Sequence, residues 1–182
     1  GIFHADVSPD GRLIATAGAD RTCRLWTADT GREVRTLWTH SVPVSACAFS
    51  PDGRWLAASA YVQPEASRPS SIYGVVRVFD LRGDDEPYEL RGGNKPLSGL
   101  TWSDDGRQLG ASSWAYLTAV WKAQPGAQPM LCQGSAPGQE QHDAVCFSPD
   151  GARVVSAVES AARVFDTRTG KELLALQGHT GK

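Results

Sequence analysis

The residues with the chemistry of catalysis or metal binding are scattered along this chain. Its four histidines lie far apart, without the spacing of metal ligands: His4, His40, His142 and His179. None of the four cysteines forms a Cys-x-x-Cys pair or lies beside clustered histidines, so the ligand spacing of zinc sites is absent. We therefore expect no metal and no cofactor.

The chain also lacks the short motifs of common catalytic and nucleotide sites. It contains no Gly-x-Ser-x-Gly elbow, no phosphate-binding loop and no His-Glu-x-x-His. The acidic pairs Asp84-Asp85 and Asp104-Asp105 fall in turns, where a solvated structural role is favoured over metal binding. The sequence predicts a protein that is not an enzyme. The alternative is a site whose residues converge from separate parts of the chain.

The composition is that of an ordinary globular domain of 182 residues, with 41% hydrophobic residues and a net charge of -2. This charge gives no electrostatic footprint for nucleic acid or an anionic membrane. No apolar run approaches the roughly 20 residues that span a bilayer. Cys47 and Cys146 fall in strand-like runs and are expected to be small buried residues, which fits reduced thiols in the cytoplasm. Because the chain begins at Gly1 without an initiator Met, we expect a piece of a longer chain.

One four-residue turn recurs along the chain. It occurs as Ser8-Pro9-Asp10-Gly11, Ser50-Pro51-Asp52-Gly53 and Ser148-Pro149-Asp150-Gly151, and with one change as Ser103-Asp104-Asp105-Gly106. In such a turn Pro presets φ, Asp bonds its own backbone and Gly takes a positive φ. The four turn glycines are 42, 53 and 45 residues apart. A period near 40–45 residues with four short strands per unit is typical of a β-propeller.

After each turn come a short apolar run and then an aromatic residue: Trp26, Phe79, Trp121 and Phe165. The alternation predicts strands in the first unit over 13–17, 22–26 and 33–37, and in the second over 42–49, 55–60, 74–79 and 87–90. It predicts a weak strand over 129–132 in the third unit, and strands over 145–147, 153–157, 162–165 and 172–176 in the fourth. We expect an all-β fold of about four blades. The repeats run over 1–38, 39–91, 92–136 and 137–177, and a further repeat starts at 178–182.

Two segments interrupt the period, 61–73 and 123–141. The first is rich in Pro and Ser and carries both signs of charge, and the second is rich in Gly, Pro, Gln and Ala. This composition predicts exposed loops. Insertions in repeat folds lie in loops on one face, which is often the binding face.

With these turns, aromatics and spacings, nearly the whole chain resembles a WD-repeat β-propeller of the prokaryotic style. The repeat of that family opens with Gly-His, carries Ser-Pro-Asp-Gly-like turns and closes its third strand with Trp-Asp. Gly178-His179 looks like the opening of a fifth repeat. The closing pairs of this chain are Trp26-Thr27, Phe79-Asp80, Trp121-Lys122 and Phe165-Asp166.

The resemblance implies a buried structural network that joins the opening His, a Ser or Thr of the second strand, an Asp of the next turn and the Trp. No unit carries the full set. Because Phe79 and Phe165 lack the indole donor, packing must hold their units instead. We expect a structural role for the matching residues, which are Thr16, Asp20, Trp26, His40, Trp121, Ser156 and His179.

The resemblance also implies a ring of about seven blades, whereas this chain holds four repeats. A blade buries both of its faces, so an open arc would leave two apolar faces and unpaired edges in water. We consider an arc of a larger ring in a longer chain, a tight ring of four blades, and two copies that complete one ring, and we favour the first. Closure across a chain boundary would bring His179 to the first unit.

For function, we expect a non-catalytic scaffold that presents loops to a protein or peptide partner, and neither nucleic acid nor membrane. One alternative is a regulatory or sensor array attached to a signalling kinase or ATPase domain of a longer chain. The other is an enzyme with a site at the mouth of the propeller channel. Aromatic and Arg residues dominate interfaces. The candidate contacts on the face of the second-to-third turns, with two polar neighbours, are Tyr61, Arg68, Tyr73, Asn94, Lys95, Trp114 and Tyr116.

Overall fold

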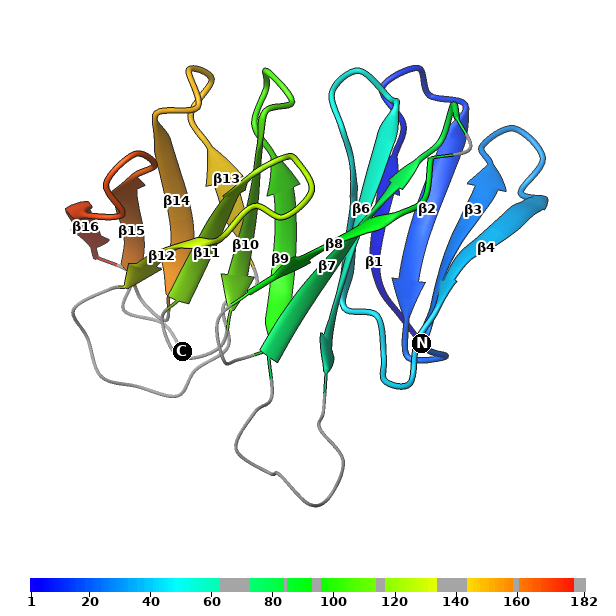
Figure 1. The fold of residues 1–182 in the computed structure, drawn as a ribbon, viewed down its shortest axis with the longest axis horizontal. Helices are drawn as coiled ribbons and strands as arrows, with labels where there is room; N and C mark the ends of the chain where they lie inside the picture. The colour runs from blue at the N-terminus through cyan, green and yellow to red at the C-terminus, as the bar shows by residue number, and fades with distance from the viewer. Residues whose placement is uncertain are drawn as a thin grey trace.

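The computed structural model describes residues 1–62, 73–83, 85–92, 96–113, 117–133, 144–158 and 161–178. These residues form four antiparallel sheets of four strands each, and no helix is present among them (Figure 1). We call the sheets blades 1 to 4 in chain order. The all-β class and the four four-stranded blades predicted from the repeats are confirmed.

Within each blade the strands lie side by side in chain order. Blade 1 contains β1 (Ile2–Val7), β2 (Leu13–Gly18), β3 (Thr22–Thr27) and β4 (Glu33–Thr39). Blade 2 contains β5 (Ala46–Phe49), β6 (Trp55–Val62), β7 (Tyr73–Asp80) and β8 (Tyr88–Arg91). Blade 3 contains β9 (Leu97–Trp102), β10 (Gln108–Ser113), β11 (Leu117–Lys122) and β12 (Met130–Gln133). Blade 4 contains β13 (Val145–Phe147), β14 (Arg153–Val158), β15 (Ala161–Asp166) and β16 (Glu172–Gln177).

The recurring turn closes the first hairpin of every blade in the same way. In blade 2, Ser50 Oγ accepts a hydrogen bond from the Trp55 amide at 2.9 Å, and Asp52 accepts one from the Arg54 amide at 3.0 Å. Gly53 has a φ of 66°, a left-handed conformation that glycine adopts without strain. The side-chain bonds recur in the other three blades. The turn therefore sets the register of each first hairpin.

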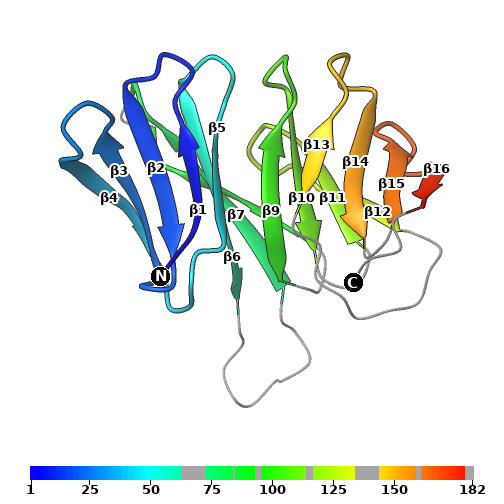
Figure 2. The same cartoon turned by 180° about the vertical axis from the view of Figure 1, so that it is seen from behind.

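The blades pack through their first and second strands. Strands β1 and β2 contact β5, β5 and β6 contact β9, and β9 and β10 contact β13. Blades 1 and 4 consequently lie at the two ends of an open arc, with blades 2 and 3 between them (Figures 1 and 2). Among the described residues the chain thus forms an arc and not a tight four-blade ring.

Each junction between blades joins a small-residue face to a large-residue face. At the junction of blades 2 and 3, blade 2 contributes mainly Ala and Val side chains. Blade 3 meets them with the buried side chains of Leu97, Leu109 and Trp121. The contact is close, because a methyl group added at Gly74 would lie 2.3 Å from Cγ of Leu97. Such interlocking faces leave little freedom in the angle between blades.

Three details differ from the sequence-based expectations. Strand β1 exists, although the alternation in the first unit predicted strands only from residue 13 onward. The first strand of blade 2 begins at Ala46 rather than at 42, because Pro43 cannot donate to a ladder. Cys146 is exposed and not buried, because its side chain lies on the uncovered side of blade 4, whereas Cys47 is buried as expected.

Candidate binding surfaces

The described part of the predicted binding face lies at the ends of β6 and β7. Tyr61 pairs with Gly74 and Tyr73 pairs with Val62, so the two tyrosines belong to neighbouring rungs of one hairpin. Both side chains are partly exposed. The guanidinium of Arg91 lies over the Tyr73 ring, 5.3 Å from its centroid, and this cation–π contact holds the ring in place. The other predicted contacts, Arg68, Asn94, Lys95, Trp114 and Tyr116, lie outside the described residues.

In blade 1, the predicted network residues make two separate sets of bonds. The Trp26 indole nitrogen donates to Thr16 Oγ1 at 2.8 Å across β2 and β3. Asp20 instead accepts from the Thr22 hydroxyl at 2.8 Å and pairs with Arg24 at 3.1 Å. The bond from Thr22 is the main cause that lowers the pKa of Asp20. Asp20 is therefore a turn carboxylate held by its own hairpin.

The remaining network candidates occupy different settings. His40 Nδ1 accepts a hydrogen bond from the Val42 amide at 3.2 Å, and its ring meets the edge of Trp38. Burial is the main cause that lowers the pKa of His40. The Trp121 indole donates to the Arg91 carbonyl at 3.0 Å, and Ser156 is buried in β14. His179 lies outside the described residues.

An ion pair that the sequence analysis did not predict joins the β5–β6 turn of blade 2 to the end of β7. The enclosed carboxylate of Asp80 accepts from Arg54 at 2.7 and 3.2 Å, and also from the amides of Arg82 and Gly83. The hydrogen bonds from Arg54 are the main cause that lowers the pKa of Asp80 to about 2. The available signal was Arg54, directly after a recurring turn, together with Asp80, the second residue of a closing pair.

The depressed pKa predicts how pH changes the stability that Asp80 provides. Its ordinary pKa is 3.8, so its contribution is fully present above that pH and is lost as the pH falls toward about 2. We expect the wild type to unfold at a higher urea concentration than Asp80→Asn at neutral pH, and the difference to shrink between about pH 4 and 2. Circular dichroism at each pH measures both midpoints. A difference that stays constant to acid pH would contradict this assignment.

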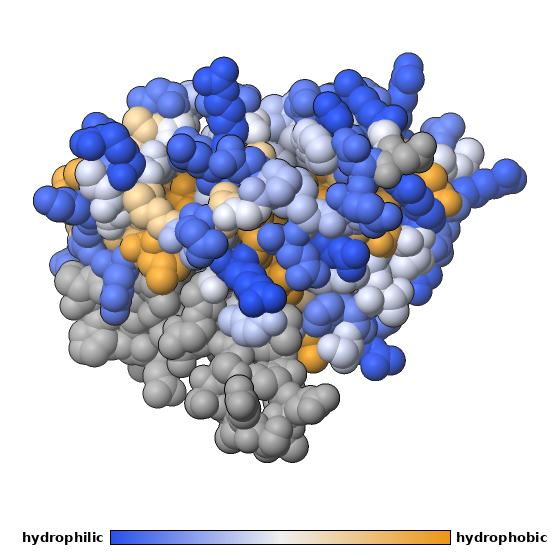
Figure 3. All heavy atoms as spheres, viewed as in Figure 1, coloured by the Kyte–Doolittle hydropathy of each residue, from blue (hydrophilic) through white to orange (hydrophobic). Residues whose placement is uncertain are grey.

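Both ends of the arc expose apolar side chains. On blade 1, Phe3 and Val7 are 59% and 54% exposed, and on blade 4, Leu174 and Leu176 are 52% and 53% exposed. Apolar residues also reach the surface at the blade 4 end of the arc in Figure 3. Monomeric proteins rarely expose large continuous apolar faces.

Comparison with known proteins identifies the class. Residues 1–27 and 31–80 match the family model "WD domain, G-beta repeat". The four four-stranded blades and a relative named for the same repeat agree with this match, so the chain is a β-propeller arc similar to WD-repeat proteins. No stretch of the described residues forms a helix with the length and apolar character needed to cross a membrane.

Several relatives match along most of this chain. The WD repeat-containing protein SL1-17 of Schistosoma mansoni is 27% identical over 94% of this chain and 52% of its own length. The target of rapamycin complex subunit LST8 of Bos taurus is 25% identical over 90% of this chain and 47% of its own. A third, eukaryotic translation initiation factor 3 subunit I of Scheffersomyces stipitis, is 32% identical over 63% of this chain and 30% of its own. The chain thus spans about half the length of the first two relatives and 30% of the length of the third.

Proposed function

We propose that this chain is a non-catalytic scaffold that binds a protein or peptide partner. The observation that carries this proposal is the partial exposure of Tyr61 and Tyr73, on neighbouring rungs at one end of the β6–β7 hairpin, with Arg91 stacked on the Tyr73 ring. Tyr and Arg are enriched among residues that dominate binding energies. The names of two relatives, LST8 and initiation factor 3 subunit I, describe subunits of larger assemblies, which supports a partner of this kind.

We expect Tyr73→Ala to weaken partner binding by about tenfold, because truncating an aromatic anchor typically costs more than about 1 kcal/mol. Tagged wild-type and variant chains would be used to purify partners from the cells that make the protein, with quantitative mass spectrometry as the readout. Asp29→Ala, an exposed change in the β3–β4 turn, is the matched control and should retain them. Partners that bind Tyr73→Ala and the wild type equally would contradict the proposed face.

We also propose that a blade of the same kind covers each end face of the arc. The support is the extent of the match, since the chain spans 52% and 47% of two relatives that it matches along 94% and 90% of its own length. Such blades would come from the rest of a longer polypeptide or from a second copy. A regulatory array joined to a kinase or ATPase stays a prediction, which the sequence on either side of these residues tests directly.

For the compartment we propose the cytoplasm. Cys23, Cys47 and Cys132 are buried free thiols in this structure, and reduced cysteines are typical of that compartment.

A further inference from the structure

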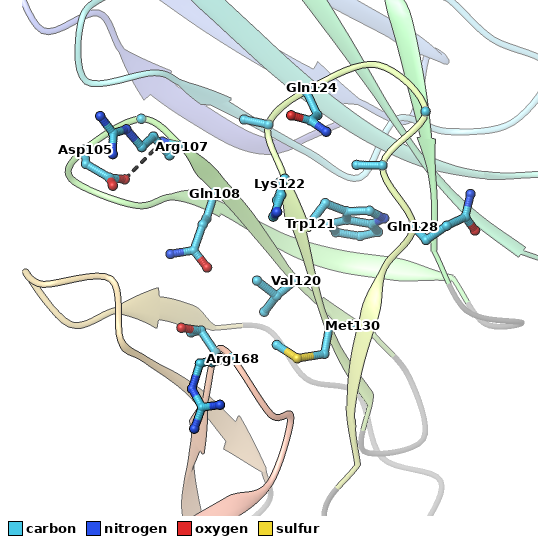
Figure 4. A pocket seen from close by; sticks show the side chains of 15 residues that line it. Asp105, Arg107, Gln108, Val120, Trp121, Lys122, Gln124, Gln128, Met130 and Arg168 are labelled. Atoms are coloured by element: carbon cyan, nitrogen blue, oxygen red, sulfur yellow. Dashed lines mark hydrogen bonds between the residues drawn. The ribbon is translucent and has the colours of Figure 1, made fainter.

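A cavity of about 990 Å³ lies between blades 3 and 4. It is lined by the β9–β10 turn, the β11–β12 loop and the β15–β16 turn, as Figure 4 shows. In an antiparallel blade these turns lie at the end of the strands opposite to the β6–β7 ends that carry Tyr61 and Tyr73. The cavity is therefore separate from the proposed binding face.

Blade 2 has an ion pair at the corresponding place. There Asp80 pairs with Trp55 in the register of β6 and β7, and its carboxylate binds the side chain of Arg54, the residue before Trp55. A backbone hydrogen bond joins the same two segments, in which the Leu81 amide donates to the Arg54 carbonyl at 2.8 Å. A cation from the first turn and an anion from the end of the third strand thus neutralise each other.

Blade 3 keeps this backbone geometry but reverses one charge. Lys122 pairs with Gln108 in the register of β10 and β11, and the residue before Gln108 is Arg107. The Ala123 amide donates to the Arg107 carbonyl at 2.8 Å, which matches the bond in blade 2. Lys122 therefore occupies the place of Asp80, and Arg107 occupies that of Arg54. Two cations remain where blade 2 has a closed ion pair.

The neighbouring carboxylates of the described residues form no direct ion pair with these cations. Arg168 of blade 4 adds a third positive charge to the lining, and the one carboxylate of the lining is that of Asp105. This carboxylate is engaged by its own turn, through the Ser103 hydroxyl at 2.6 Å and the Arg107 amide at 3.0 Å. Within the described part of the chain, none of the ion pairs includes the three cations of the lining.

The same cavity also has apolar walls. Val120 and Met130 line it, and the Met130 side chain is partly buried (Figure 4). Three glutamine side chains complete the lining with amide groups: Gln108, Gln124 and Gln128. Binding sites of this kind combine apolar area with a few polar groups that fix orientation.

We propose that this cavity binds an acidic segment of a partner protein, with a carboxylate taking the place that Asp80 fills in blade 2. Lys122 stands where blade 2 has a carboxylate, and the partner supplies the missing negative charge. A peptide fits better than a small free anion, because the volume and the apolar walls allow side chains beside the carboxylate to be buried as well. This inference rests on the proposed role as a protein-binding scaffold and names the chemistry of one partner segment.

The test measures binding of a fluorescein-labelled peptide of alternating aspartate and leucine by fluorescence anisotropy. The wild type is expected to bind it at least about tenfold more tightly than the matched asparagine–leucine peptide. Lys122→Asp recreates the Arg54–Asp80 pair of blade 2, so the variant should fold, and it should weaken binding by about tenfold or more. Lys171→Asp makes the same charge change outside the cavity and should weaken binding less than about twofold.

Three results would overturn the inference. Equal weakening by Lys122→Asp and Lys171→Asp would show general electrostatic attraction without a site. Displacement of the peptide by inorganic phosphate below about 1 mM would assign the cavity to phosphate groups instead of carboxylate side chains. No binding of the aspartate peptide to the wild type would reject the cavity as an acidic-peptide site. This last outcome is distinguishable from failure of the scaffold proposal, because partner capture that depends on Tyr73 would persist.

Discussion

Replacement of Trp121 by alanine is expected to lower the free energy of unfolding by about 3–5 kcal/mol, the usual cost of deleting a large aromatic from a core. Trp121 is the largest fully buried side chain among the described residues, and it fills the junction between blades 2 and 3. Its indole also donates to the Arg91 carbonyl at 3.0 Å. The alanine variant therefore opens a cavity and leaves this carbonyl without its donor. Urea unfolding followed by circular dichroism measures the loss.

Trp26 provides the matched control for this prediction. It closes the third strand of blade 1 as Trp121 closes that of blade 3, but it lies on an end face that no blade of this chain covers. We expect Trp26→Ala to cost about 1–2 kcal/mol, for the lost bond to Thr16 and a smaller area returned to water. Equal losses at the two positions would show that burial at the blade junction is not what makes Trp121 important.

The repeat was enough to predict the fold, and the reason is physical. Each recurring turn determines its own local conformation through a serine, an aspartate and a glycine, so the hairpins can be located without tertiary information. Strand β1 escaped prediction because its sequence, Ile2–Val7, carries three large apolar side chains that are exposed and an aspartate that accepts a hydrogen bond from the Phe49 amide of the next blade. That contact depends on packing between blades, which alternation does not record.

The binding features were harder to predict, because they depend on register across strands. Lys122 follows an aromatic residue as Asp80 does, and the sequence shows this change plainly. What it does not show is that Arg54 reaches Asp80, since the two are 26 residues apart and meet only through the pairing of β6 and β7. Only with that contact known does a lysine in the same place indicate an unneutralised site.

The two ends of the arc are the separated halves of one kind of junction. In blade 1, Ala15, Ala17 and Leu25 pack on blade 2, so the uncovered side is the one with Val7, Ile14 and Trp26. In blade 4 the order is reversed. Val154 and Phe165 pack on blade 3, which leaves Val155, Val164 and Leu174 on the uncovered side.

The large-residue half is thus free at one end and the small-residue half at the other. Because the two uncovered faces differ, the blade 1 end of one copy can pack on the blade 4 end of another copy, whereas two identical ends do not match.

This arrangement predicts that the 182-residue chain by itself associates beyond its 19.5 kDa monomer, because the free halves of two copies can cover each other. Introducing charge into one half, by Leu174→Glu with Leu176→Glu, should return the mass measured by light scattering to that of the monomer. Both side chains are more than half exposed, so the substitutions should cost little stability. Leu131→Glu, at a 45% exposed leucine of β12 away from both ends, should leave association unchanged. A wild-type chain that stays monomeric at high concentration would show that the end faces do not recognise each other, and it would leave only blades of a longer polypeptide to cover them.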